Sequence, residues 1–177
     1  MLKVFLGKKA ILDVKRMLKF KGDTYKGFIS NMVYDTTNKR FLVTNGKALI
    51  ICNYKVYDLG EPTSNFMTVS VLDSENVILS DSNESYPMID RVVPPASDMN
   101  KVTDFYNNGK ADVLYKNLAI ALNSISNAID TRYLLNLPQG EYEISERIHE
   151  PKGHSIILTG GCNLGNLTVV IMPISLT

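Results

Sequence analysis

The sequence predicts an α+β fold made of two β-α-β-β-β units, with the helices on one side of an antiparallel sheet. Near each end of the chain, a helical period follows one strand-like segment and precedes three more, so the same order of elements occurs twice. We place the first unit at residues 1–57, a β-hairpin and connector at 58–108, and the second unit at 109–177. Two such units can join their sheets edge to edge.

The composition fits a globular protein with a single core. The chain has 177 residues, of which 45% are hydrophobic and 21% are charged. No apolar run approaches the ~20 residues of a membrane-spanning helix, and Lys8, Lys9 and Asp13 interrupt any signal peptide. Two cysteines, Cys52 and Cys162, make no disulfide framework, so we expect a reducing, cytoplasmic setting and no membrane partner.

The first unit begins with a strand over residues 1–6. A helix over 8–20 follows, because its apolar residues recur every three or four positions, and Gly22 lies where glycine commonly ends a helix. Asn45-Gly46 is a strong signal for a tight hairpin between two strands. The three strands expected after the helix cover residues 27–35, 40–44 and 47–57.

The connector contains four prolines and two strand candidates, 66–72 and 76–80, which we expect to form a hairpin. In the second unit, a strand over 112–122 precedes a helix over 124–137 that has Ser124 as its N-cap. The three strands expected after this helix cover residues 141–148, 155–159 and 167–176.

Four stretches of the sequence carry a family resemblance. They are the segment 29–52, which ends in the hairpin TNGKALI; YPMIDRVVPP at 86–95; DTRYLLNLPQGEYEIS at 130–145; and VVIMPISLT at 169–177. They resemble, in the family's order, parts of the bacterial replicative sliding clamps, the β subunits of DNA polymerase III. The family counterparts include a T-D-G-H-R-L-A hairpin, an F/Y-P-D-Y-x-R-V-I-P stretch and the ending Y-V-V-M-P-M-R-L. The resemblance implies a DNA-clamp-like fold.

The chain departs from the family in size and in some residues. Clamps have three domains of two units each, whereas this chain has two units in all, as if half of a central domain were joined to half of the final one. Asn45, Lys47 and Ala48 replace the aspartate, histidine and arginine of the family hairpin. The second helix carries only Asp130 and Arg132, so the basic character of helices that face the ring interior is kept in the first helix alone.

Charge is concentrated at the N-terminus. Residues 1–26 hold eight basic and two acidic side chains, a net +6, which leaves −5 on the remainder because the whole chain carries +1. This asymmetry favours a polyanionic partner, although a solvated helix face produces the same pattern. The resemblance implies that the first helix contacts double-stranded DNA through Lys8, Lys9, Lys15, Arg16 and Lys19.

The resemblance also implies an apolar groove that captures clamp-binding peptides of polymerase or repair proteins. The matching positions are Thr44, Gly46, Leu49, Val170, Met172, Pro173 and Ile174. Methionine and branched aliphatic side chains would make such a groove adaptable. The alternative is that Leu49, Val170 and Met172 are ordinary core residues of two strands.

Enzymatic motifs are weak. The segment from His149 to His154 could bind a metal, but the proline and glycine between the histidines indicate a hairpin loop instead. The glycine-rich segment 160–165 lacks the Lys-Ser/Thr of a phosphate loop and indicates a wide turn. Cys52 lies in an apolar strand, where we expect it to be buried and inert. We therefore expect no catalytic residue, no metal and no cofactor.

The sequence and the resemblance together predict a non-enzymatic sliding-clamp-like protein of DNA replication. Two alternatives remain: a degenerate clamp-fold scaffold that binds protein only, and a metal-dependent hydrolase that uses the His149/His154 loop. A chain this short could surround a duplex only as an oligomer joined through edge strands. In free solution we expect a monomer or a small homo-oligomer.

Overall fold

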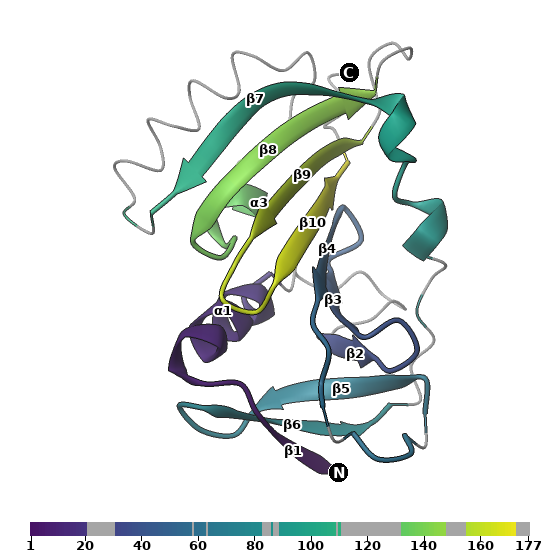
Figure 1. The fold of residues 1–177 in the computed structure, drawn as a ribbon, viewed down its shortest axis with the longest axis vertical. Coiled ribbons are helices and arrows are strands. Elements are labelled where there is room, and N and C mark those ends of the chain that lie inside the picture. Colours follow the sequence, from purple (N-terminus) through teal and green to yellow (C-terminus); the bar gives the residue numbers. More distant parts are fainter. Residues whose placement is uncertain are drawn as a thin grey trace.

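The computed structural model describes residues 1–20, 31–57, 59–62, 64–82, 86, 89–108, 110, 132–147 and 155–172. Within this part of the chain, the strands form one ten-stranded sheet in the order β1-β6-β5-β2-β3-β4-β10-β9-β8-β7 (Figure 1). The strands are β1 Leu2–Phe5, β2 Val33–Asp35, β3 Arg40–Thr44, β4 Ala48–Asn53, β5 Phe66–Val71, β6 Asn76–Asp81, β7 Met99–Asn107, β8 Gly140–Arg147, β9 Ile156–Gly161 and β10 Asn166–Ile171. The helices are α1 Lys8–Leu18 and α3 Arg132–Leu135, with 3₁₀ turns η1 at Ile89–Arg91 and η2 at Ala96–Asp98.

Helix α1 forms where the apolar period predicts it. Gly7 precedes the helix with a φ of 85°, a left-handed conformation that glycine adopts without steric cost, and this lets the chain turn from β1 into α1. Ala10, Ile11, Val14 and Met17 are buried on the face that packs on the sheet. The helix therefore has one apolar face and leaves the other to solvent.

The hairpin β5–β6 occupies a central place in the first half of the sheet. β5 pairs with β2, with Val33 opposite Thr68, and β6 pairs with β1, with Leu2 opposite Leu79. β1 and β2 are therefore not neighbours, although α1 is the only element described between them in the chain. The hairpin that the sequence predicted between the two units completes the sheet of the first.

The two halves of the sheet join through β4 and β10. These strands are antiparallel, from Asn53 opposite Asn166 to Ala48 opposite Ile171. Each unit ends in one of these strands, so the ends of the two units lie at the centre of the sheet. Residues 48–53 and 166–171, which are far apart in the sequence, thereby become neighbours.

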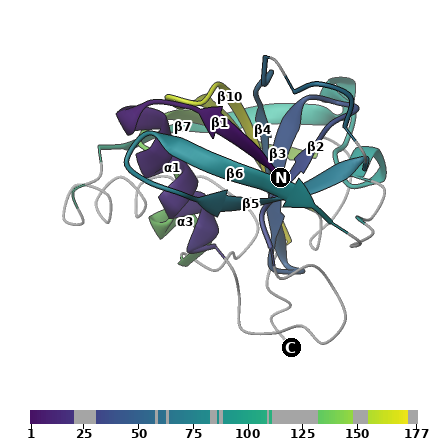
Figure 2. The same ribbon diagram turned by 90° about the horizontal axis from the view of Figure 1, so that it is seen from below.

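Each face of the sheet carries its own apolar cluster. The larger cluster, which we call the helix-side cluster, includes Val14 and Met17 of α1 and Leu134 of α3, so both helices pack on the same face (Figure 2). The Phe20 and Tyr133 rings, whose centroids are 5.9 Å apart, bring the ends of α1 and α3 together. The smaller cluster lies on the opposite face and consists of Val33, Leu42, Leu49, Ile51, Ile89, Ile157 and Val170; we call it the outer cluster.

Strand β7 lies in the stretch that we expected to be a connector, so that prediction was wrong for 99–107. Its outward side chains include Lys101 and Asp104, and only Phe105 and Asn107 are buried, so the strand lacks the apolar alternation that would identify it. It forms because β8 supplies a partner along its whole length, with an irregularity between Lys101 and Thr103. The expected strand at 112–122 and most of the expected helix at 124–137 lie outside the described residues.

Candidate nucleic-acid interface and peptide groove

The solvent face of α1 carries four exposed lysines, Lys8, Lys9, Lys15 and Lys19, which we call the basic face. Lys8, Lys15 and Lys19 are separated by seven and four positions, so their side chains lie in one row along the helix. Leu12 lies in the same row and is also exposed. The basic face therefore gathers four cationic side chains, with Leu12 among them, on the side of the helix that points away from the sheet.

Arg16 differs from these lysines. It is half-buried, and its guanidinium lies 3.8 Å from the carboxylate of Asp13 one helical turn earlier. Part of its charge is compensated by this pair, so its contribution to a phosphate-binding surface is smaller than that of an exposed lysine. Arg16 borders the basic face and also shields the carboxylate of Asp13.

A partly buried polar contact holds α1 in position. Asp13 is only 1% exposed, and its Oδ2 accepts hydrogen bonds from the backbone N–H of Asn163 at 2.8 Å and from the Asn163 side-chain amide at 2.9 Å. Asn163 lies in the turn between β9 and β10, so the second unit holds the helix of the first. The basic face is thus presented by a helix that is anchored at both its apolar and its polar positions.

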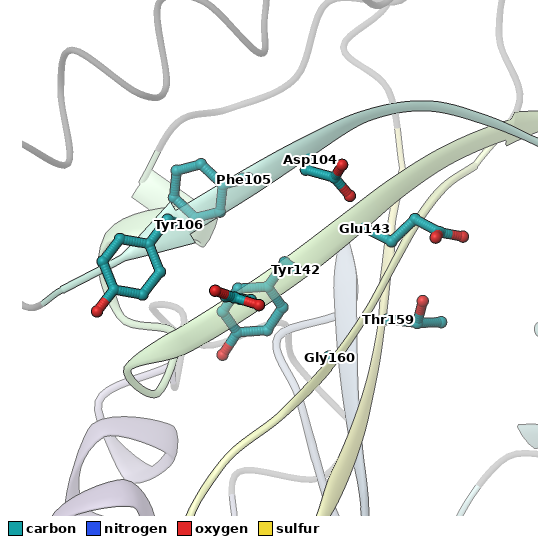
Figure 3. A pocket seen from close by; sticks show the side chains of 8 residues that line it. Asp104, Phe105, Tyr106, Tyr142, Glu143, Thr159 and Gly160 are labelled. Atoms are coloured by element: carbon teal, nitrogen blue, oxygen red, sulfur yellow. The ribbon is translucent and has the colours of Figure 1, made fainter.

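The opposite face of the sheet is acidic in its second half. Phe105 and Tyr142 point into the helix-side cluster, so their strand neighbours Asp104, Glu141 and Glu143 point the other way. These acids and Thr159 line an open hollow of about 660 Å³ across β7, β8 and β9 (Figure 3).

Lys101 bridges two acids of this hollow, with its ammonium 2.8 Å from Asp104 and 3.2 Å from Glu143. These contacts raise the pKa of Lys101. We did not foresee this surface from the sequence, because β7 was not expected; the only usable signal was the acid-tyrosine-acid alternation at 141–143.

The predicted hairpin joins β3 and β4 and holds two of the positions predicted for the groove, Thr44 and Gly46. The Asn45 side-chain oxygen accepts the N–H groups of Lys47 at 3.0 Å and Ala48 at 2.8 Å, and Gly46 has a φ of 82°. The Thr44 hydroxyl donates to the Ala48 carbonyl at 2.8 Å and accepts the Gly46 N–H at 3.1 Å. Thr44 and Asn45 together satisfy most of the turn's polar groups.

The structure brings this hairpin and the last strand together. Val170 lies opposite Leu49 in the β4–β10 ladder, and the N–H of Met172 donates to the Lys47 carbonyl at 2.9 Å. Thr44, Gly46, Leu49, Val170 and Met172 therefore belong to one region of the surface and the strands beneath it. Pro173 and Ile174, the other two predicted positions, lie outside the described residues.

These residues differ in their access to solvent. Leu49 is 7% and Val170 is 1% exposed, and both belong to the outer cluster, which Ile89 of the connector helps to cover. Met172 is 47% exposed, and its sulfur accepts a hydrogen bond from the Ser155 hydroxyl at 3.2 Å. Of the described positions predicted for the groove, Met172 and Gly46 of the hairpin are therefore accessible to solvent, whereas Leu49 and Val170 are buried.

Among the described residues, no group of three or more histidine, cysteine, aspartate or glutamate side chains is arranged to hold a metal ion. His149 and His154 lie outside that part of the chain. In the same described ranges, α1 and α3 are too short or too polar to cross a bilayer as a helix.

Comparison with known proteins identifies a solved structure with a similar fold. No family model matches the sequence, and no curated protein matches it significantly. The structure is similar to that of DNA polymerase III subunit beta from Borrelia burgdorferi, solved in complex with a natural product, with a TM-score of 0.60 and 15% sequence identity. The match covers 100% of this chain and 65% of that protein, so the chain spans less than two thirds of its length. The chain therefore has the fold of the DNA polymerase III β subunit, the bacterial sliding clamp.

Proposed function

We propose that this protein is a non-enzymatic, cytoplasmic sliding-clamp-like protein of DNA replication that holds double-stranded DNA against the basic face of α1. The observation that carries the proposal is the division of charge across a clamp-fold sheet. Lysines occupy the exposed side of a helix on one face, and Asp104, Glu141 and Glu143 occupy the other. A duplex is attracted to the first face and repelled by the second.

Lysine contacts of this kind suit a processivity factor. An ammonium group binds phosphate as a point charge and does not read base edges, so binding does not depend on sequence and the protein can slide. Each phosphate contact releases condensed counterions, which gives a slope of about −0.9 in log K against log salt. Binding through the four lysines of the basic face should therefore be strongly salt-dependent.

Assembly around DNA would use the edges of the sheet. β1 and β7 are its terminal strands within the described residues. The β1 edge carries Lys3 and the exposed Phe5, and the β7 edge carries Asp104 and the exposed Tyr106. Opposite charge and exposed aromatic rings favour pairing of β1 from one copy with β7 from the next. In free solution the protein is a monomer or a small oligomer, and DNA promotes its assembly.

Partner proteins would bind at the groove between the hairpin and the last strand. Met172 provides an exposed, adaptable apolar contact, and Gly46 allows a peptide to approach the hairpin backbone closely. Short clamp-binding peptides of polymerase or repair proteins fit this chemistry. The likeness in fold to the β subunit supports this location.

The test is a comparison of two triple variants. Lys8→Glu, Lys15→Glu and Lys19→Glu should weaken binding to all duplexes alike and flatten its salt dependence. Lys47→Glu, Lys55→Glu and Lys110→Glu make the same charge change at exposed lysines outside α1, so they should retain most of the affinity. Equal losses in both variants, or no binding by the wild type at low salt, would exclude the basic face as a DNA site. A wild type that still bound peptides would then be a scaffold for protein alone.

A further inference from the structure

Residues 89–98, which we call the strap, lie between β6 and β7 in the chain and pack on the outer cluster. Ile89 of the strap is 4% exposed and shares this cluster with Leu49 and Val170. The other fully buried members of the cluster come from strands of the sheet, so among the described residues Ile89 is the side chain added from outside them. Val93 of the strap packs against the same cluster. The strap therefore covers the two positions of the predicted groove that are buried.

The backbone hydrogen bonds described for the strap stay inside it. The N–H groups of Val92 and Val93 donate to the Ile89 carbonyl at 2.9 Å and 3.3 Å, and the Asp98 N–H donates to the Pro95 carbonyl at 2.9 Å. The two prolines at 94 and 95 have no N–H to offer to a neighbouring strand. The contacts described between the strap and the sheet are therefore apolar side-chain contacts, without a strand ladder.

The chain on either side of the strap is fixed to the sheet by other contacts. On one side, the Tyr86 ring lies 5.6 Å from the ring of Phe66 in β5. On the other side, Met99 begins β7 and pairs with Arg147 of β8. A segment with few buried side chains and no ladder hydrogen bonds opens locally at a lower cost than the sheet beneath it. The strap can therefore lift from the outer cluster while the strands stay paired.

We propose that the strap is an autoinhibitory cover of the peptide groove, and that the apolar anchor of a clamp-binding peptide replaces Ile89 on Leu49 and Val170. This inference rests on the proposed function, because it names what regulates access to that groove. One apolar side chain leaves the cluster as another enters it, so the exchange keeps the cluster shielded from water. The apparent affinity for the peptide is the intrinsic affinity reduced by the fraction of molecules in which the strap is lifted. The strap thereby selects peptides whose anchors pack better than Ile89.

Calorimetric titration with a short Gln- and Leu-containing clamp-binding peptide tests the cover. Ile89→Ala removes most of the side chain that the peptide must displace, so it should bind the peptide at least about tenfold more tightly than the wild type. Val92→Ala is the matched control, because Val92 belongs to the strap but is 39% exposed and lies outside the outer cluster, so its affinity should equal that of the wild type. Ile89→Val, which removes one methylene group, replaces Ile89→Ala if that variant does not fold and should shift the affinity in the same direction by a smaller factor.

Limited digestion of the wild type with trypsin reports whether the strap moves. Arg91 ends the 3₁₀ turn η1 inside the strap and is exposed, so it is a site for this protease. Cleavage after Arg91 should become faster when the peptide saturates the groove, because proteolysis follows the population of the opened segment. Cleavage after Lys55, an exposed residue beyond the end of β4, should keep its rate. A peptide that binds without changing the rate at Arg91 contradicts the displacement of the strap.

The titration separates failure of the strap from failure of the groove. If the wild type and the Ile89 variant bind the peptide with equal affinity, the groove stands and the strap does not regulate it. If neither protein binds the peptide, both proposals fail, and Ile89, Leu49 and Val170 are ordinary core residues. Tighter binding by the Ile89 variant, together with faster cleavage after Arg91 in the wild-type complex, establishes the strap as the cover.

Discussion

The carboxylate of Asp13 accepts two hydrogen bonds from Asn163, at 2.8 Å from the backbone N–H and 2.9 Å from the side-chain amide. Asp13 belongs to α1 in the first unit, and Asn163 belongs to the β9–β10 turn in the second. A carboxylate that is 1% exposed must have partners, because burying an unpaired charge is costly. This contact makes the orientation of the basic helix depend on the end of the chain.

Removing the carboxylate should loosen this junction. Asp13→Ala removes the charged acceptor of two hydrogen bonds from Asn163, which should lower the free energy of unfolding by about 1–3 kcal/mol in urea titrations. Asp13→Asn keeps an acceptor oxygen and should cost less. Glu61→Ala, at an exposed acidic position, is the control and should change stability by no more than about 0.5 kcal/mol. Equal stability of Asp13→Ala and the wild type would mean that the contact is not stabilising.

Tyr34 should be a second stabilising residue. Its hydroxyl donates to the Tyr54 carbonyl at 3.1 Å and accepts the Val56 N–H at 3.0 Å, and the residue is 0% exposed. Tyr34→Phe leaves both backbone groups unpaired and should reduce stability by about 1–3 kcal/mol, measured by chemical denaturation. Tyr57→Phe, at a residue that is 74% exposed, is the matched control. A loss in the control as large as in Tyr34→Phe would reject this explanation.

The same tyrosine predicts a dependence on alkaline pH. Burial raises the pKa of Tyr34 above its ordinary value of 10.0. The unfolded chain therefore loses this proton first as the pH rises, so the stabilisation is fully present below pH 10.0 and is lost above it, as the pH approaches the raised folded pKa. Stability measured across this range should fall more steeply for the wild type than for Tyr34→Phe. Parallel profiles for the two proteins would show that Tyr34 does not contribute.

The stability of the hairpin turn should depend on the side-chain oxygen of Asn45. Asn45→Ala removes the acceptor for the Lys47 and Ala48 N–H groups, at about 0.5–1.5 kcal/mol for each hydrogen bond. Asn45→Asp retains an acceptor oxygen and matches the family hairpin, so its melting temperature should stay close to that of the wild type. If the two variants melt together, the side-chain oxygen has no role in the turn.

The groove can be tested at its exposed residue. Met172→Asp should abolish binding of a short Gln- and Leu-containing clamp-binding peptide in calorimetric titration, because a carboxylate cannot be buried cheaply against an apolar anchor. Leu72→Asp is a matched control, since Leu72 and Met172 are each 47% exposed and Leu72 lies in the β5–β6 turn. The groove is excluded if the wild type binds no such peptide or if Met172→Asp binds it equally well. Leu49 and Val170 would then be core residues only.

The features that could be predicted from the residues alone are local ones. Helix α1 begins at Lys8 as predicted, and strand β3 matches its expected range of 40–44, because apolar period and turn residues act over only a few positions. The hairpin after Thr44 follows from the chemistry of asparagine and glycine within the turn itself. The family resemblance was also readable, because its motifs are short contiguous stretches, and the clamp fold confirms it.

Which distant segments meet could be learned only from the folded structure. No local pattern shows that β1 pairs with β6 or that a polar stretch becomes β7. Strand order depends on which edges can bury apolar faces together after long loops have closed, and that balance belongs to the whole chain. The burial of Leu49 and Val170 was undecided for the same reason: a strand's apolar side chains suit a groove and a core equally until the covering segment is placed.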